Sequence, residues 1–122
     1  MKTAALSLLL MALAPWVRAA EDCAGPDGRA MITTLVSHAG EDRPVSITFG
    51  TRVDGVKIPA ELVSQHPDEM TVILQYEFDR PVVTKTGIEV GLWFNRRFAR
   101  VAIPFAAIRA VYDNRLRTCV AG

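Results

Sequence analysis

The feature that most constrains the fold is an alternation of apolar and other residues between positions 68 and 112. In its first run, apolar side chains stand at every second position, at Met70, Val72, Leu74, Tyr76 and Phe78. A second run repeats this period at Ile88, Val90, Leu92 and Phe94. A period of two gives a strand one apolar face, so each strand can bury one side. Short interruptions at residues 79–81 and 95–97 favour antiparallel neighbours. The stretch therefore predicts a β-meander.

The flanking segments add two helices and further strands. Residues 29–38 fit a short helix, and residues 59–64 fit another because Pro59 suits a first helical position. Pro104 lacks a ladder donor and marks a bend at residues 104–107. Strands are expected at residues 44–51, 108–112 and 116–120. The sequence predicts a mainly β fold: an open, strongly bent meander barrel with one N-terminal helix and one short internal helix.

The first 19 residues have the pattern of a secretory signal peptide. Lys2 precedes an apolar run at residues 4–16, and small residues surround Arg18 at the expected cleavage site after Ala19. The run is too short for a membrane span, and no lipid-anchor cysteine follows it. A buried or dimer-forming helix is the alternative. We expect a signal peptide at residues 1–19, a loop and short helix at 20–43 and a β-domain at 44–122, in the periplasm or outside the cell.

Charge argues against several kinds of partner. Removal of Lys2 and Arg18 changes the formal net charge from +1 to −1. A near-neutral domain lacks the electrostatic footprint of a protein that binds nucleic acid or anionic lipid. We therefore expect no nucleic-acid partner and no stable membrane anchor.

The chain has two cysteines, Cys23 and Cys119, near opposite ends of the expected mature domain. In an oxidising compartment an even pair favours one disulfide, which would tie the N-terminal segment to the last strand. Two unpaired thiols are the alternative. The chain has no Cys-x-x-Cys motif, and His38 and His66 are its only histidines that could add metal ligands. The sequence therefore predicts no metal site and no cofactor.

No catalytic motif is present: there is no phosphate-binding glycine loop, nucleophile elbow or His-Glu-x-x-His helix. We therefore expect a protein that is not an enzyme. Ile73 and Trp93 point opposite to the main apolar sets, and Gln75 shares the face of Ile73. Such a surface is a candidate peptide site, and an open strand edge could add an extended peptide. The alternative is that Ile73 and Trp93 belong to the core of a half-open barrel.

Three basic residues, Arg96, Arg97 and Arg100, cluster at one predicted hairpin. Guanidinium groups bind carboxylates, so these residues are candidates for contact with a peptide carboxylate or acidic side chains. A solvated turn is the alternative interpretation.

Four blocks, in this order and spacing, carry a resemblance to a known family: ITFGTRVDGVKIP at 47–59, PDEMTVILQYEF at 67–78, IEVGLWFN at 88–95 and VAIPFAAIRAVYD at 101–113. They resemble the stringent starvation protein B (SspB) family. The resemblance implies an open, bent, Sm-like β-barrel preceded by a helix through which members dimerise. It implies a non-catalytic adaptor that binds ssrA-type degradation tags or unfolded-protein termini and delivers them to the ClpXP protease.

The chain departs from the family pattern in three places. It ends at Gly122 without a long acidic linker to a ClpX-docking motif, and the turn at 95–97 is shorter than the glycine-bearing hairpin usual there. A signal peptide also stands where the dimerisation helix is expected, although ClpX is cytoplasmic. One expectation is an exported peptide- or protein-binding module with no protease partner. The other is a start at Met31, which gives a cytoplasmic protein and restores ClpX.

Overall fold

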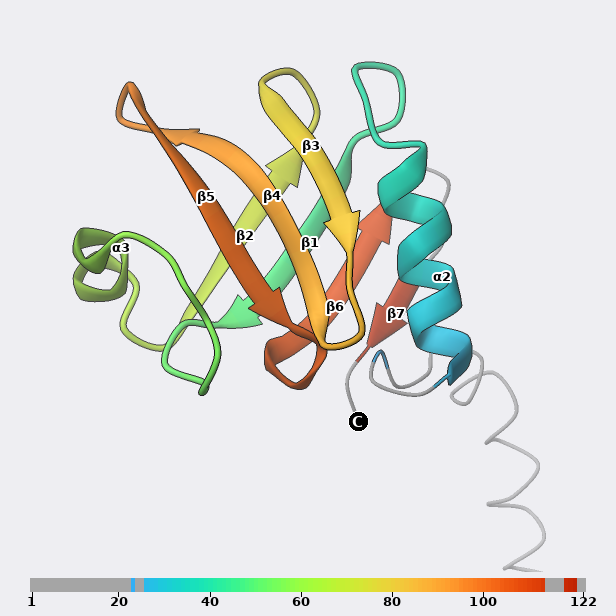
Figure 1. The fold of residues 1–122 in the computed structure, drawn as a ribbon, viewed down its shortest axis with the longest axis horizontal. Helices are drawn as coiled ribbons and strands as arrows, with labels where there is room; N and C mark the ends of the chain where they lie inside the picture. The colour runs from blue at the N-terminus through green and yellow to red at the C-terminus, as the bar shows by residue number, and fades with distance from the viewer. Residues whose placement is uncertain (1–22, 24–25, 114–117, 121–122) are drawn as a thin grey trace, which may run out of the picture.

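The computed structural model describes residues 23, 26–113 and 118–120. Two antiparallel sheets make up most of this part of the chain (Figure 1). The first sheet has the order β2-β1-β6-β7, and the second has the order β3-β4-β5. The strands are β1 (Val45–Gly50), β2 (Glu69–Leu74), β3 (Phe78–Val83), β4 (Gly87–Phe94), β5 (Arg97–Pro104), β6 (Ile108–Asp113) and β7 (Thr118–Val120).

Two α-helices and one 3₁₀ turn complete the described part: α2 (Pro26–Ser37), α3 (Ala60–Gln65) and η1 (Phe105–Ala107). The predicted mainly β class is therefore confirmed, with the N-terminal helix and the short internal helix in place. The bend expected at Pro104 is η1. The sheets do not close into a barrel within the described residues.

The predicted meander is only partly correct. Strands β3, β4 and β5 pair in sequence, but β2 pairs with β1, and β6 returns to the other side of β1. The first run breaks at residues 75–77 rather than at 79–81. Residues 79–81 lie inside β3, where a register shift between Asp79 and Val82 forms a bulge. Arg80 there has φ 42°, and the bulge accommodates Pro81, which has no donor for the ladder.

The core lies between the two sheets. Along β1 the side chains of Val45, Ile47 and Phe49 are fully buried, because this strand is central in its sheet and alternates inward and outward. Helix α2 contacts β3 and β7 and covers the side where these two edge strands lie (Figure 1). Its residues Ile32 and Leu35 complete the cluster. Full burial of such side chains stabilises the fold by about 1.5–3 kcal/mol each.

Helix α2 offers a matched pair of substitutions. Leu35 is 2% exposed and packs into the core, whereas Thr33 on the same helix is exposed. We expect Leu35→Ala to lower the free energy of unfolding by about 2–5 kcal/mol, because it leaves a cavity. Thr33→Ala should change it by about 0.5 kcal/mol or less. Denaturant unfolding measures both values, and equal effects would mean that α2 is not part of the packed core.

Candidate functional site

A groove runs between β2 and the end of β4. It has a volume of ≈ 310 Å³ and is lined by Met70, Thr71, Val72, Ile73, Glu77, Leu92, Trp93 and Phe94. We call it the β2–β4 groove. Two neighbouring hollows adjoin it: one is lined by Glu77, Phe78, Trp93 and Arg96, and the other by Ile73, Gln75, Tyr76 and Glu77. Glu77 lines all three, so together they form one extended surface.

The structure brings Ile73 and Trp93 together on this surface, although they lie in different sheets. Ile73 is 56% exposed and Trp93 is 52% exposed, so the interpretation of both as core residues is wrong. Trp93 is opposite Phe98 in the β4–β5 ladder, and their rings meet edge to face with centroids 5.3 Å apart. This contact fixes the indole orientation while leaving much of its surface open to a ligand.

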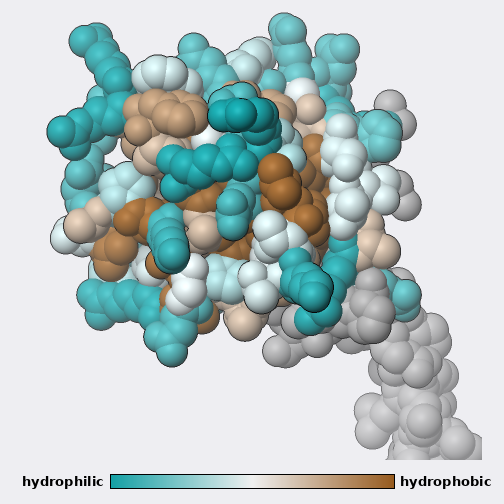
Figure 2. Space-filling view, viewed as in Figure 1, coloured by the Kyte–Doolittle hydropathy of each residue, from teal (hydrophilic) through white to brown (hydrophobic). Residues whose placement is uncertain are grey.

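Sequence reasoning missed Tyr76 and Phe98. Tyr76 is 70% exposed, yet the alternation placed it among the core residues. It falls in the break after β2, where the period of two no longer describes a strand. Phe98 is exposed on the outer face of its sheet, where apolar patches are interrupted by hydrophilic side chains (Figure 2). No pattern in the sequence separates these exposed aromatic residues from buried ones.

The three arginines of the predicted cluster have different environments. Arg97 lies 3.7 Å from a carboxylate oxygen of Glu61 on α3. Arg100 donates hydrogen bonds to the main-chain oxygens of Asp79 (3.1 Å) and Arg80 (2.8 Å), across β4. Arg96 makes no hydrogen bond or ion pair with the described residues, and its side chain lines the hollow beside Trp93. Of the three, Arg96 is the one whose guanidinium has no partner among the described residues.

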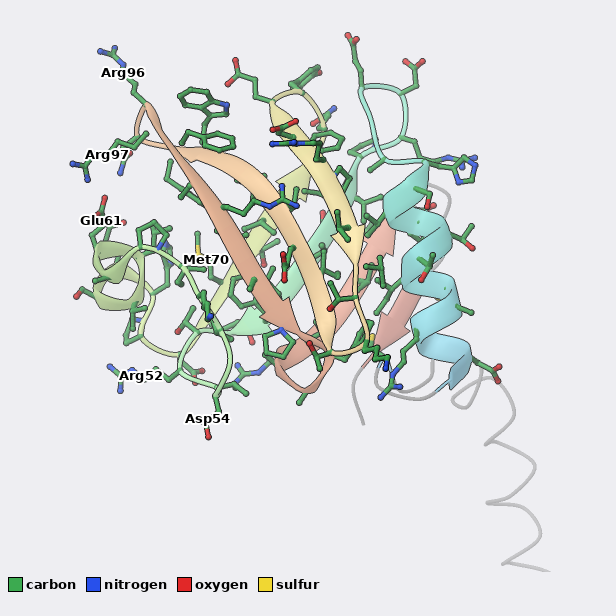
Figure 3. The ribbon with its side chains drawn as sticks, in the orientation of Figure 1. Arg52, Asp54, Glu61, Met70, Arg96 and Arg97 are labelled. Carbon is green, nitrogen blue, oxygen red and sulfur yellow. The ribbon has the colours of Figure 1, made fainter. Side chains whose placement is uncertain are left out.

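Figure 3 shows Arg96 and Arg97 at the tip of the β4–β5 hairpin, with Met70 further toward the body of the molecule. The hairpin turn consists of Asn95 and Arg96, because Phe94 pairs directly with Arg97. Asn95 has φ 50° and Arg96 has φ 69°. Two-residue turns of this kind favour Asn followed by Gly, because Gly has no Cβ to strain. Arg96 therefore holds a backbone conformation that is strained for a residue with a Cβ.

A salt-bridge cluster fixes the start of β2. Nη1 of Arg109 on β6 lies 2.9 Å from Oε1 of Glu69 and 3.6 Å from Oδ2 of Asp68. The hydrogen bond with Glu69 raises the pKa of Arg109. The guanidinium crosses β1 at Gly50, where a Cβ would lie 2.9 Å from it. The cluster therefore joins β2 to β6 across the outer face of the sheet.

Acidic, histidine and cysteine side chains are dispersed over the described residues. Among them, no three His, Cys, Asp or Glu side chains gather where they could hold a metal ion. A further hollow of ≈ 330 Å³ involves Asp54 and Glu89, but its other lining residues are hydroxyl-bearing, small or apolar. No helix in the described part is long and apolar enough to cross a membrane. The expected signal peptide at residues 1–19 lies outside the described residues.

The two cysteines occupy neighbouring elements. Cys23 is fully buried in the core and is not a free thiol. Cys119 lies in β7, where its backbone pairs with Val111 of β6. Helix α2, which begins just after Cys23, contacts β7. The side chain of Cys119 lies outside the described residues, so a Cys23–Cys119 disulfide stays a prediction.

Comparison with known proteins bears on the whole β-domain. Residues 29–120 match the family model SspB, stringent starvation protein B, which is well over half of the chain. The match begins inside α2 and ends in β7, so it covers both sheets. It confirms the resemblance inferred from the four sequence blocks. No curated protein matches the chain.

The strained hairpin generates a stability test. We expect Arg96→Gly to raise the free energy of unfolding by about 0.5–1 kcal/mol, because glycine relieves the strain at φ 69°. Arg97→Gly is the matched control, since Arg97 starts β5 and pairs with Glu61. That variant should be less stable than the parent protein. Denaturant midpoints measure both, and a destabilised Arg96→Gly would contradict the proposed strain.

Proposed function

Because the chain belongs to the stringent starvation protein B (SspB) family, we propose that it is a non-catalytic adaptor that binds ssrA-type degradation tags for delivery to the ClpXP protease. Membership in this family supports an adaptor role of this general kind. The identity of the tag and of the protease is the finer part of the proposal.

The exposed aromatic surface of the β2–β4 groove is the observation that carries this proposal. Trp93 stands half exposed on Phe98, and Ile73 stands half exposed on the other side of the groove. Aromatic anchors held in place before binding dominate the affinity of small interfaces, because few rotamers must be fixed. The surface is open and elongated, which suits a segment of polypeptide better than a small substrate.

Charges on this surface suggest which peptides it accepts. Arg96 and Glu77 line the same hollow beside Trp93, and neither has an ion-pair partner among the described residues. A free guanidinium favours a carboxylate, and the glutamate favours a donor such as an amide or an ammonium group. We infer that the preferred peptide carries an acidic side chain near Arg96 and an apolar side chain on Trp93.

A second candidate function keeps the peptide site and drops the protease. Met31 lies inside α2, and a start there would delete Cys23 and Arg29. Cys23 is part of the buried cluster, and the Arg29 guanidinium lies 5.2 Å from the ring centre of Phe105. These contacts favour a start upstream of Cys23, which would keep the signal peptide expected at residues 1–19. An exported protein would not meet ClpX, and its partner would be a polypeptide outside the cytoplasm.

Titration with a fluorescently labelled ssrA-type tag peptide tests the adaptor proposal. We expect saturable binding that Trp93→Ala weakens about tenfold or more, as expected for an aromatic anchor. Because Trp93 is half exposed, the melting temperature of the Trp93→Ala variant should fall by only about a few degrees. Val82→Ala is the control, since Val82 is 45% exposed on β3 and does not line the groove. An absence of binding by the parent protein up to millimolar peptide would overturn the proposal.

Thiol counting and N-terminal sequencing test the location. For an exported protein we expect a mature start near Ala20 outside the cytoplasm and two more reactive thiols in reducing than in non-reducing denaturant. A cytoplasmic protein that starts at Met31 would contain Cys119 alone of the two cysteines. That result would rule out the exported peptide-binding protein and would make ClpX the expected partner again. A homodimer stays a prediction in either case.

A further inference from the structure

Three of the four sheet edges are obstructed. The edge of β5 is covered by Lys57, whose backbone exchanges two hydrogen bonds with Ala102, of 2.9 and 3.0 Å. The edge strand β3 contains Pro81 and the bulge after Asp79, and α2 contacts it. Strand β7 is three residues long and is also contacted by α2. Natural sheets protect their edges with such devices, because an open edge recruits another strand.

Strand β2 has none of these protections. It spans six residues, EMTVIL, without proline, lysine or arginine. Its register with β1 is continuous from Val45–Leu74 to Gly50–Glu69, so no bulge turns the edge away. Within the described residues, no hydrogen bond joins its backbone to any partner other than β1. The β2–β4 groove runs along this strand.

The ladder pattern identifies which backbone groups of β2 face outward. The amide of Thr51 donates to the carbonyl of Asp68 at 3.2 Å, which makes these residues a hydrogen-bonded pair. In an antiparallel ladder such pairs alternate with pairs whose N–H and C=O groups point away from each other. Val72 therefore bonds to β1, whereas the amides and carbonyls of Thr71 and Ile73 point to the open edge.

We propose that a bound peptide joins the first sheet as an additional strand along β2, held by the outward backbone groups of Thr71 and Ile73. This inference rests on the proposed function and specifies how the same site binds. Strand addition satisfies backbone groups whatever the side chains are, which suits a receptor for many unfolded termini. Side-chain preference then comes from Trp93 and Arg96 at the end of the groove.

Charge favours a foreign peptide over a second copy of this chain. If β2 of another copy occupied the edge, its only charged side chain would be Glu69, which already bonds to Arg109. Arg96 would then lack a carboxylate partner. The hollow that Arg96 lines adjoins the groove, because Trp93 lines both. A peptide with an acidic side chain supplies that partner.

Amide hydrogen exchange, followed by NMR with the labelled ssrA-type peptide, tests the inference. In the free protein the Thr71 and Ile73 amides should exchange quickly, and the Val72 amide slowly. Saturation with peptide should slow Thr71 and Ile73 by about tenfold or more. Binding without this slowing would overturn strand addition and leave peptide binding intact, whereas an absence of binding would overturn both. Slow exchange in the free protein, together with a dimeric mass in sedimentation, would identify a second copy as the occupant.

A matched pair of variants provides an independent readout. Thr71→Pro removes the outward amide without removing a bond to β1, and proline is tolerated at such edge positions. Thr71→Val keeps the amide and, like proline, removes the hydroxyl that lies 2.7 Å from Thr48 Oγ1. We expect Thr71→Pro to bind the peptide about tenfold more weakly than Thr71→Val. Equal affinity of two folded variants would overturn the inference, and if Thr71→Pro fails to fold, the exchange experiment decides.

Discussion

The pairing of β1 with two strands from distant parts of the sequence is the constraint on which the rest of the structure depends. Its inward side chains Val45, Ile47 and Phe49 are fully buried, and its two edges bond to β2 and β6. Because β2 pairs with β1 and not with β3, the strands divide into two sheets. Among the described residues this pairing also leaves the far edge of β2 without a neighbouring strand, and the groove forms there, beside the end of β4.

The outer face of the second sheet is shaped by a small number of close contacts. Gly91 lies between Asp79 and Arg100 in the ladders, and a Cβ at this position would collide with the ring of Phe98. The absence of a side chain lets Phe98 lie close to the sheet and support Trp93. Arg100, which pairs with Gly91 in the ladder, donates hydrogen bonds to the main-chain oxygens of Asp79 and Arg80 in the β3 bulge. Gly91 therefore lies beside both the β3 bulge and the Trp93–Phe98 pair.

A binding surface of this kind separates affinity from selectivity. In the proposed mode of binding, backbone groups on β2 and the indole of Trp93 would contact almost any extended segment, whereas Arg96 and Glu77 would discriminate by charge. Both proposed locations of the protein use the same surface, and they differ only in which polypeptides reach it.

The sequence by itself determined strands β1, β4 and β6, the helix that begins near Pro59 and the family, because period-two alternation, proline and the four ordered blocks are local signals. It did not separate β2 from β3, because the alternation continues through the break at residues 75–77. It also placed Ile73 and Trp93 on the outward faces. Only the tertiary structure decided that they share one groove, that Tyr76 is exposed and that Arg96, unlike Arg97 and Arg100, has no partner among the described residues. Each of these depends on which strands pair and on which side chains meet across β4. Such contacts join residues far apart in the chain, and periodicity does not encode them.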